Sequence, residues 1–353
     1  MTDDLPEADR LDGHPHPRET PRLFGQEAAE AAFLEAWNTG RLHHGWLLTG
    51  PQGIGKATLA WRIARFLLTD PPARAETLDA TEGHPALPRI RALSDPGVML
   101  IRRPWDEKTK KLKTQITVDE VRRLGGFFGM SAGGRRVVIV DPVDELNPSA
   151  SNAILKLLEE PPAQATLLLV SHQPARLLPT IRSRCRVLRL QPLAQPALEA
   201  AVEQAGGHPA AASALAEGSV GAALELAEGG AEIYEALLDL FAGPSMDRAR
   251  ARKLADACSG KAGQPRLDAT LGALARLLHR AARAGLLGTP VDAPEAEVRT
   301  LTRLAPHDAA ARTWAHVAQE VSDRATHARA VNVDPAAIVW DALARVDAQA
   351  RRI

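Results

Sequence analysis

The stretch GPQGIGKAT, residues 50–58, decides the fold of this chain. It follows a short apolar run, GWLLT, and precedes a segment in which Leu59, Ile63 and Phe66 recur at helical spacing. A glycine-rich turn between a buried strand and an amphipathic helix is typical of a phosphate-binding loop, because backbone N–H groups and the helix N-terminus both face the anion. A chance glycine-rich turn is the alternative, and the flanking strand and helix disfavour it.

Each position of the loop has an expected role. The glycines let the backbone turn inward on a phosphate, and the lysine supplies a positive charge to the outer phosphates. Magnesium-dependent hydrolysis needs a Ser or Thr hydroxyl directly after that lysine, but Ala57 stands there. The hydroxyl of Thr58 lies ~100° further around the helix and should point elsewhere. The residues assigned to nucleotide contact are Gly50, Gly53, Gly55, Lys56, Ala57, Thr58 and Asp141.

A second apolar run, VVIV, ends at Asp141, where an acid that holds magnesium belongs at the carboxyl edge of a parallel sheet. A simple turn-starting aspartate is the alternative for this residue taken alone. The next residue is Pro142, whereas ATPases of this architecture place a glutamate there to orient the attacking water. Asp144 and Glu145 lie nearby, and nothing in the sequence indicates that they replace it.

Composition limits the class of protein. The 353 residues include 43 basic and 43 acidic side chains, so the formal net charge is zero, which disfavours nucleic acid as the sole partner. Two cysteines are too few for a disulfide framework or a cysteine-rich zinc site. The N-terminus has no apolar signal region, and no apolar run approaches the ~18 residues that span a bilayer. We therefore expect a cytoplasmic protein with no membrane partner.

Four parts are expected along the chain. Residues 1–22 are polar and proline-rich and are predicted to form a disordered leader. In residues 23–191 the runs GWLLTG, RRVVIVD, ATLLLVSH and CRVLRL alternate with helical patterns, which predicts an α/β domain with a parallel sheet. Alanine- and leucine-rich helices follow, as a small lid at 192–231 and a helical domain at 232–353. Within the α/β domain, residues 71–116 are expected to be irregular.

One helix is clearly signalled within the α/β domain. Asn147 can cap its N-terminus, Pro148 suits its first position, and the pair Pro161–Pro162 ends it. Between these limits Ile154, Leu157 and Leu158 fall on one face.

This helix carries a family signature. The sequence SNAILKLLEEPP, followed by a strand and then LLPTIRSRC, resembles the clamp-loader ATPases of the AAA+ class over residues 23–226. The resemblance implies a P-loop AAA+ domain, a helical lid and an all-α collar that joins subunits into a ring. It implies that Arg184 of the SRC motif is an arginine finger acting on ATP held by a neighbouring subunit. Without the resemblance, the simpler interpretation is that Arg184 is one of several arginines that flank a strand.

The same resemblance indicates which kind of subunit this is. Motor subunits carry a lid arginine in a GSxRDAL-like stretch, but the matching GSVGAAL has Gly221 there. The hydroxyl at 57, the glutamate at 142 and this arginine are therefore missing together, while Arg184 is retained. That pattern is similar to a non-motor, stator-type subunit, which holds ATP or ADP with magnesium without efficient hydrolysis.

The resemblance also bears on other parts of the chain. The family's four-cysteine zinc module has no cysteines to form it in residues 71–116, so no zinc is expected. The stretch NVDPAAIVWDALARV is similar to the family's closing helix, and Cys185 is expected to be a small buried hydrophobe.

The partners implied by the resemblance are gamma/tau motor subunits, a delta subunit, a sliding clamp and, through the complex, primed DNA.

Two alternative functions stay open. An active ATPase would need Thr58 or a water to serve magnesium, and another acid in place of Pro142. A DNA-binding adaptor would use Lys108–Lys113 and the pair Arg135–Arg136, although a solvated loop or strand edge is the simpler interpretation of the lysine run. The family senses the γ-phosphate near residues 171–173, SHQ, and the sequence does not say which of the three does so.

Overall fold

The computed structural model describes residues 5–129, 134–208, 215–260, 263–291 and 293–353. The chain divides into two compact units, Met1–Ala223 and Leu224–Ile353. Most of the predicted lid therefore belongs to the first unit. The predicted domain boundaries at 22, 191 and 231 stay predictions.

The first unit is built on a five-stranded sheet in the order β2-β5-β6-β1-β7, in which every pair is parallel. Leu47 lies opposite Leu169, and Val138 lies opposite Leu167, so apolar side chains of neighbouring strands are in register. The predicted parallel sheet is confirmed, and the four predicted runs correspond to β1, β5, β6 and β7. The strands are β1 (Gly45–Thr49), β2 (Val98–Ile101), β5 (Arg136–Val140), β6 (Ala165–Ser171) and β7 (Arg186–Arg189).

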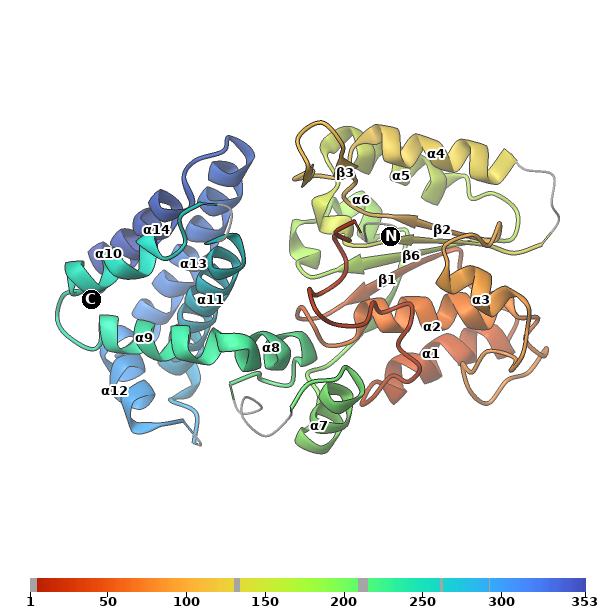
Figure 1. The fold of residues 1–353 in the computed structure, drawn as a ribbon. Helices are drawn as coiled ribbons and strands as arrows, with labels where there is room; N and C mark the ends of the chain where they lie inside the picture. The colour runs from red at the N-terminus through yellow and green to blue at the C-terminus, as the bar shows by residue number, and fades with distance from the viewer. Residues whose placement is uncertain (1–4, 130–133, 209–214, 261–262, 292) are drawn as a thin grey trace. The chain divides into compact units, whose positions relative to one another are not determined.

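Helices cover both faces of this sheet, α4 and α5 on one face and α1, α2 and α3 on the other (Figure 1). Because helices cover both faces of the sheet, side chains on both faces are buried. The strands therefore appear in the sequence as continuous hydrophobic runs. Leu59 and Ile63 of α2 are fully buried, and burying a side chain of this size stabilises the fold by about 1.5–3 kcal/mol. The helices of this unit are α1 (Glu27–Asn38), α2 (Lys56–Leu68), α3 (Ala86–Arg91), α4 (Val118–Gly129), α5 (Pro148–Glu159), α6 (Pro179–Arg182) and α7 (Gln195–Gln204), with short η1 (Val143–Glu145) and η2 (Pro174–Arg176); α8 (Val220–Glu225) follows.

Helix α5 begins and ends as its sequence predicts. The side chain of Asn147 accepts a hydrogen bond of 2.8 Å from the backbone N–H of Ala150, and Pro148 occupies the first turn. Ile154 and Leu158 are buried against the sheet, while Leu157 is partly buried. The family-signature helix is therefore fixed by local capping and by its apolar face together.

The segment 71–116 is more regular than expected. It contains α3, the edge strand β2 and an antiparallel hairpin of β3 (Trp105–Asp106) and β4 (Lys111–Leu112). The expectation of an irregular segment was wrong for these elements. Their runs are only two to six residues long, too short to show a periodic pattern in the sequence.

The second unit is entirely helical in its described residues, as predicted. Three side chains form a buried polar cluster at its centre: the hydroxyl of Tyr234 donates to Glu297 at 2.6 Å, and Arg280 forms an ion pair with the same carboxylate. All three are nearly or fully buried. The elements are η4 (Leu226–Gly230), α9 (Ala231–Phe241), α10 (Arg248–Asp256), α11 (Gln264–Leu287), α12 (Glu295–Leu304), α13 (Asp308–Ala330) and α14 (Pro335–Ala350).

Among the described residues, none of the helices has the length and apolar character needed to cross a bilayer. Within that same part of the chain, no three His, Cys, Asp or Glu side chains are grouped so that they could hold a metal ion.

Candidate functional site

The phosphate-binding loop connects β1 to α2, as the sequence predicts. The φ angles of Gly50, Gly53 and Gly55 are 145°, 76° and 99°. Residues other than glycine rarely adopt φ angles in this region. A Cβ atom at Gly50 would lie 2.6 Å from the Cδ1 atom of Ile54. The glycines are therefore required by the backbone path of the loop as well as by space.

Lys56 is buried, with 3% of its surface exposed, and its ammonium is turned into the loop. Its Nζ donates to the carbonyl of Gly50 at 2.7 Å and to the carbonyl of Pro51. Burial lowers the pKa of this ammonium to about 8, although the nearby carboxyls of Asp141 and Asp144 act in the opposite direction. A phosphate group in the loop would supply an anion in direct reach of this buried ammonium, whose hydrogen bonds go to neutral carbonyls.

Asp141 stands at the end of β5, close enough to Lys56 for their charges to interact. Burial raises the pKa of its carboxyl to about 8, and the acidic groups of Asp9, Glu145 and Asp144 add to this shift. A protonated carboxyl is a poor ligand for magnesium. The loop lysine and the predicted strand-end acid therefore lie near each other, and burial favours the neutral form of the acid.

The two acids after Pro142 are engaged elsewhere. Asp144 accepts hydrogen bonds from the Ser171 hydroxyl at 2.7 Å and from the backbone N–H of His172 at 2.5 Å. Glu145 forms an ion pair with Arg103 at 2.7 Å. Both carboxylates therefore have structural partners at the carboxyl edge of the sheet, which leaves neither of them in the role of a water-orienting base.

Of the three candidate sensing residues, His172 is distinct. Ser171 is bound to Asp144, and the side chain of Gln173 accepts from Arg176 at 3.0 Å. Burial lowers the pKa of His172 to about 3, helped by the charge of Lys56, so its imidazole is neutral. Its Nδ1 atom is buried without a hydrogen-bond partner in the structure. Of the three, His172 is thus the side chain with a buried polar atom that has no hydrogen-bond partner, and it lies near enough to Lys56 for that charge to act on it.

The segment that resembles a motor-subunit lid motif lies directly on the phosphate-binding loop. The hydroxyl of Ser219 donates to the carbonyl of Gln52 at 2.9 Å, and the N–H of Gly221 donates to the carbonyl of Gly53 at 3.2 Å. A Cβ atom at Gly221 would lie 3.1 Å from the Cα of Gly53. The absence of an arginine at 221 was visible in the sequence, whereas this close contact between two glycines was not.

Arg184 lies on the surface after α6, with 37% of its side chain exposed. It forms an ion pair with Glu159 at 3.0 Å and donates to the carbonyl of Thr180 at 3.1 Å. The partners of Arg184 thus belong to α5 and α6 and not to the phosphate-binding loop of this chain. The guanidinium is held mainly by a half-exposed ion pair, which is a weak interaction. Cys185 beside it is partly buried against the core, and burial raises the pKa of its thiol to about 12.

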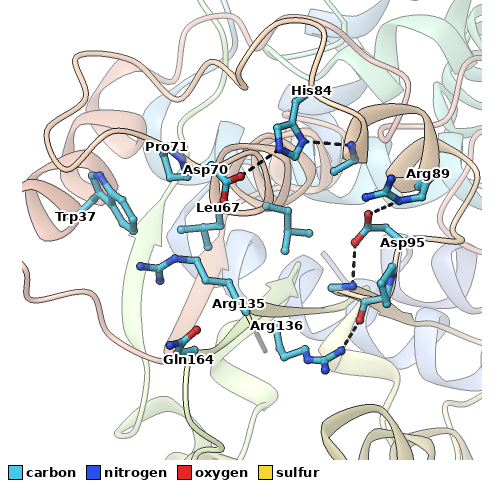
Figure 2. A pocket seen from close by; sticks show the side chains of 15 residues that line it. Trp37, Leu67, Asp70, Pro71, His84, Arg89, Asp95, Arg135, Arg136 and Gln164 are labelled. Atoms are coloured by element: carbon cyan, nitrogen blue, oxygen red, sulfur yellow. Dashed lines mark hydrogen bonds and ion pairs between the residues drawn. The ribbon is translucent and has the colours of Figure 1, made fainter. Parts of the chain in front are cut away.

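Sequence reasoning missed a cavity of about 490 Å³ at the amino ends of the strands (Figure 2). The guanidinium of Arg135 lies over the Trp37 ring, 4.6 Å from its centroid, and Arg89 pairs with Asp95 at 3.0 Å. Arg135 precedes β5 whereas Asp141 follows it, so the cavity and the phosphate-binding loop lie at opposite edges of the sheet. Its residues come from six separate segments, which no local pattern could bring together.

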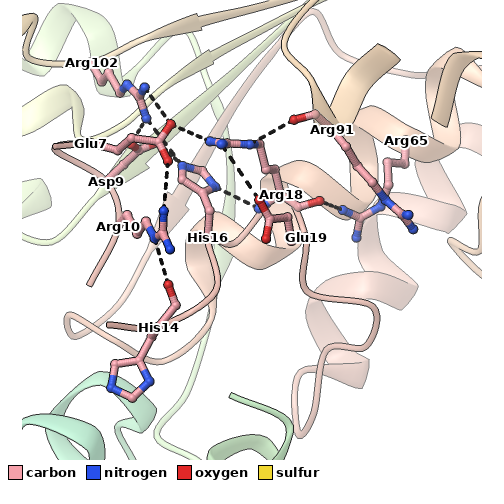
Figure 3. Close-up of polar contacts among 10 residues, drawn as sticks. All are labelled: Glu7, Asp9, Arg10, His14, His16, Arg18, Glu19, Arg65, Arg91 and Arg102. Atoms are coloured by element: carbon pink, nitrogen blue, oxygen red, sulfur yellow. Dashed lines mark hydrogen bonds and ion pairs between the residues drawn. The ribbon is translucent and has the colours of Figure 1, made fainter. Parts of the chain in front are cut away.

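The disorder predicted for the leader is not what the structure shows for residues 5–22, whereas residues 1–4 lie outside the described residues. Residues 5–22 pack on the rest of the first unit, held by a cluster of ion pairs (Figure 3). Asp9 and His16 are fully buried side chains 3.0 Å apart, and Arg102 binds Glu7 at 2.8 Å and also Asp9. Charged residues scattered among prolines give no periodic signal, so composition alone suggested disorder.

The fold and the loop together define the class: the first unit is a P-loop module of the AAA+ type, as predicted. Residues 25–194 match the family described as DNA polymerase III, delta subunit. The DNA polymerase III subunit delta' of Pseudomonas aeruginosa is 44% identical over 144 residues, which is 40% of this chain and 41% of the relative. The delta' subunit of Escherichia coli is 32% identical over 206 residues, or 53% of this chain and 58% of the relative.

A DNA polymerase III subunit tau from Salmonella typhimurium is 30% identical over 171 residues, 48% of this chain and 25% of the relative. The chain is thus a relative of DNA polymerase III clamp-loader subunits, delta' among them, which confirms the resemblance seen in its motifs. The matched part spans about half the length of the curated delta' relatives.

Proposed function

We propose that this chain is the non-motor, stator-type subunit of a bacterial DNA polymerase III clamp loader, a delta' subunit. One observation carries the proposal: the hydrolytic groups are absent at Ala57, Pro142 and Gly221, while Arg184 is available at the surface. Matches to both delta' and tau subunits support a place among clamp-loader subunits.

The phosphate-binding loop holds ATP or ADP without efficient hydrolysis. The buried ammonium of Lys56 fits a phosphate, and the unused Nδ1 of His172 is the candidate contact to the terminal phosphate. Magnesium fits less well, because Ala57 carries no hydroxyl and burial favours the protonated form of Asp141. When bound, the metal would neutralise charge on the phosphates, and Asp141 is the side chain that would hold it.

Arg184 acts on the nucleotide of a neighbouring subunit. An arginine that reaches a transferring phosphoryl group stabilises its negative charge and is worth ~10³–10⁵ in rate in well-studied systems. The half-exposed pair with Glu159 costs little to break, so the guanidinium is free to exchange Glu159 for a phosphate when subunits assemble.

The partners that follow from this role are gamma/tau motor subunits, a delta subunit and the sliding clamp, with primed DNA bound through the complex. The protein would act in the cytoplasm during replication. Within the ring it provides a fixed surface against which the motor subunits move.

ATP binding and hydrolysis by the full chain alone, with magnesium, test the proposal. We expect binding without measurable turnover, and loss of binding in Lys56→Ala. Turnover that is abolished by Lys56→Ala would instead establish an active ATPase. The engagement of Asp144 and Glu145 with structural partners argues against that alternative.

A further inference from the structure

The hairpin of β3 and β4 has a turn that is fixed by its own hydrogen bonds. The Asp106 carboxylate accepts from the backbone N–H groups of Lys108 at 2.8 Å and Thr109 at 3.3 Å. These bonds hold the pKa of Asp106 below its usual range. Lys110 adopts a φ of 52° and its N–H donates to the Asp106 carbonyl at 2.8 Å. The tip therefore has a defined shape.

The hairpin and the residue that follows it concentrate positive charge, on a chain whose formal net charge is zero. Four lysines fall within six residues, and all four are exposed. Of the two acids beside them, Asp106 is turned to the backbone and Glu107 pairs with Lys110 at 2.6 Å. The lysines are Lys108, Lys110, Lys111 and Lys113.

The segment that leads into the hairpin is anchored through two adjacent arginines. Arg103 binds Glu145, in the turn after β5, and Arg102 binds Glu7 and Asp9 of the leader (Figure 3). These contacts attach the hairpin to two other segments of the first unit. A charged surface that is held in place before binding loses less conformational entropy when it meets its partner.

We propose that this hairpin contacts the phosphate backbone of nucleic acid through its four lysines, without reading base sequence. The inference rests on the proposed function, in which the complex that contains this chain binds primed DNA. The chemistry of the tip favours a phosphate backbone over an acidic protein surface. Three of the four lysines lie in residues 107–111, EKTKK, which contain neither an aromatic nor an aliphatic hydrophobic side chain, and the hydrophobic residues of the hairpin, Trp105 and Leu112, are partly buried. Protein interfaces, in contrast, are depleted in lysine and enriched in aromatic residues. Lysine binds phosphate as a point charge, which suits contact that is independent of sequence.

The salt dependence of DNA binding by the full chain tests this inference. Fluorescence anisotropy with a labelled DNA that joins a duplex to a single strand gives the affinity at several salt concentrations. Each phosphate contact contributes about 0.7–0.9 to the slope of log affinity against log salt, so replacing all four lysines by glutamine should lower that slope by roughly 2–4. Replacing them by arginine preserves the charge and should preserve the slope.

A matched control removes four exposed positive charges elsewhere, at Arg248, Arg250, Arg252 and Lys253 of α10, and should leave the slope within one unit of wild type. The inference is overturned if the wild-type chain does not bind DNA at low salt, if the hairpin variant keeps its slope, or if the control lowers the slope equally. Tighter binding to polyglutamate than to DNA would also overturn it. ATP turnover in the assembled complex reports on the proposed function separately, so either result can fail alone.

Discussion

Lys56 shows how a single residue is adapted to this loop. Its ammonium is buried and is bonded to carbonyls of its own loop, and the carboxyls of Asp141 and Asp144 lie near enough to act on its charge. A group in this position couples its protonation to the binding of an anion, because the anion stabilises the charged form.

Binding of metal-free ATP should therefore weaken as the pH rises through about 8. Above that pH Lys56 loses its proton, and Asp141, whose pKa burial raises to about 8, gains a negative charge; both changes disfavour an anion. We expect roughly tenfold lower affinity at pH 9 than at pH 7.5 by titration calorimetry. An affinity that stays constant between these pH values would contradict the lowered pKa of Lys56 in the loop.

Gly53 should tolerate alanine poorly, because a Cβ atom would lie 2.5 Å from the Ser219 hydroxyl and 2.9 Å from the backbone nitrogen of Gly221. Its positive φ adds a further cost. We expect Gly53→Ala to lower the free energy of unfolding by about 2–4 kcal/mol, measured by chemical denaturation.

Gly83 provides the matched control, since its φ is 71° and a Cβ atom there would have open space. Gly83→Ala should cost only about 1–2 kcal/mol, from backbone strain alone. Equal losses for the two variants would show that the contact of Ser219 and Gly221 with the loop is absent in solution.

At the scale of elements, α5 is the helix whose limits rest most clearly on local chemistry. Asn147→Ala removes the side chain that accepts the N–H of Ala150 and should destabilise the fold by about 1 kcal/mol. Asn152→Ala, at an exposed position within the same helix, should instead stabilise it by a few tenths of a kcal/mol. Thermal unfolding of both variants would show shifts of opposite sign, and shifts of the same sign would contradict the capping role.

The elements differ in how far sequence could predict them. The strands β1, β5 and β6 are buried on both faces and read as apolar runs, and α5 has a cap, an apolar face and a stop. The edge strand β2 is four residues long, and the leader has no periodic pattern. The position of β2 depends on its pairing with β5, and that of the leader on ion pairs across about 90 residues, such as Arg102 with Glu7 and Asp9. No local pattern records either contact.

The features of the candidate site also differ in how far the sequence could predict them. The residues of the loop and the acid at the end of β5 could be assigned because a glycine-rich turn and a strand-end acid are local features. The engagement of Asp144 by Ser171, and the contact of Gly221 with Gly53, depend on tertiary packing. The shifted pKa values of Lys56 and Asp141 arise from burial and were equally invisible in the sequence.

At the scale of the whole molecule, the buried cluster in the second unit should control the stability of that unit. Glu297→Gln removes the negative charge beside the buried guanidinium of Arg280, which should cost about 3–5 kcal/mol. Hydrogen exchange should then accelerate within residues 224–353 and remain unchanged in the first unit.

Asp256→Asn is the control for this change, because it disrupts an exposed pair with Arg252 on α10 and should cost less than about 1 kcal/mol. Acceleration of exchange in both units by Glu297→Gln would contradict the view that each unit is a separate cooperative structure.

The central claim is that this chain supplies chemistry to a neighbour. ATP turnover by a complex assembled from the full chain and its motor partners tests it most directly, with Arg184→Ala compared to Arg182→Ala, an exposed arginine of the same segment. The account predicts that Arg184→Ala lowers turnover at the adjacent site by ~10³–10⁵ while Arg182→Ala changes it little. A loss far below tenfold for Arg184→Ala, in a complex that still assembles, would contradict it.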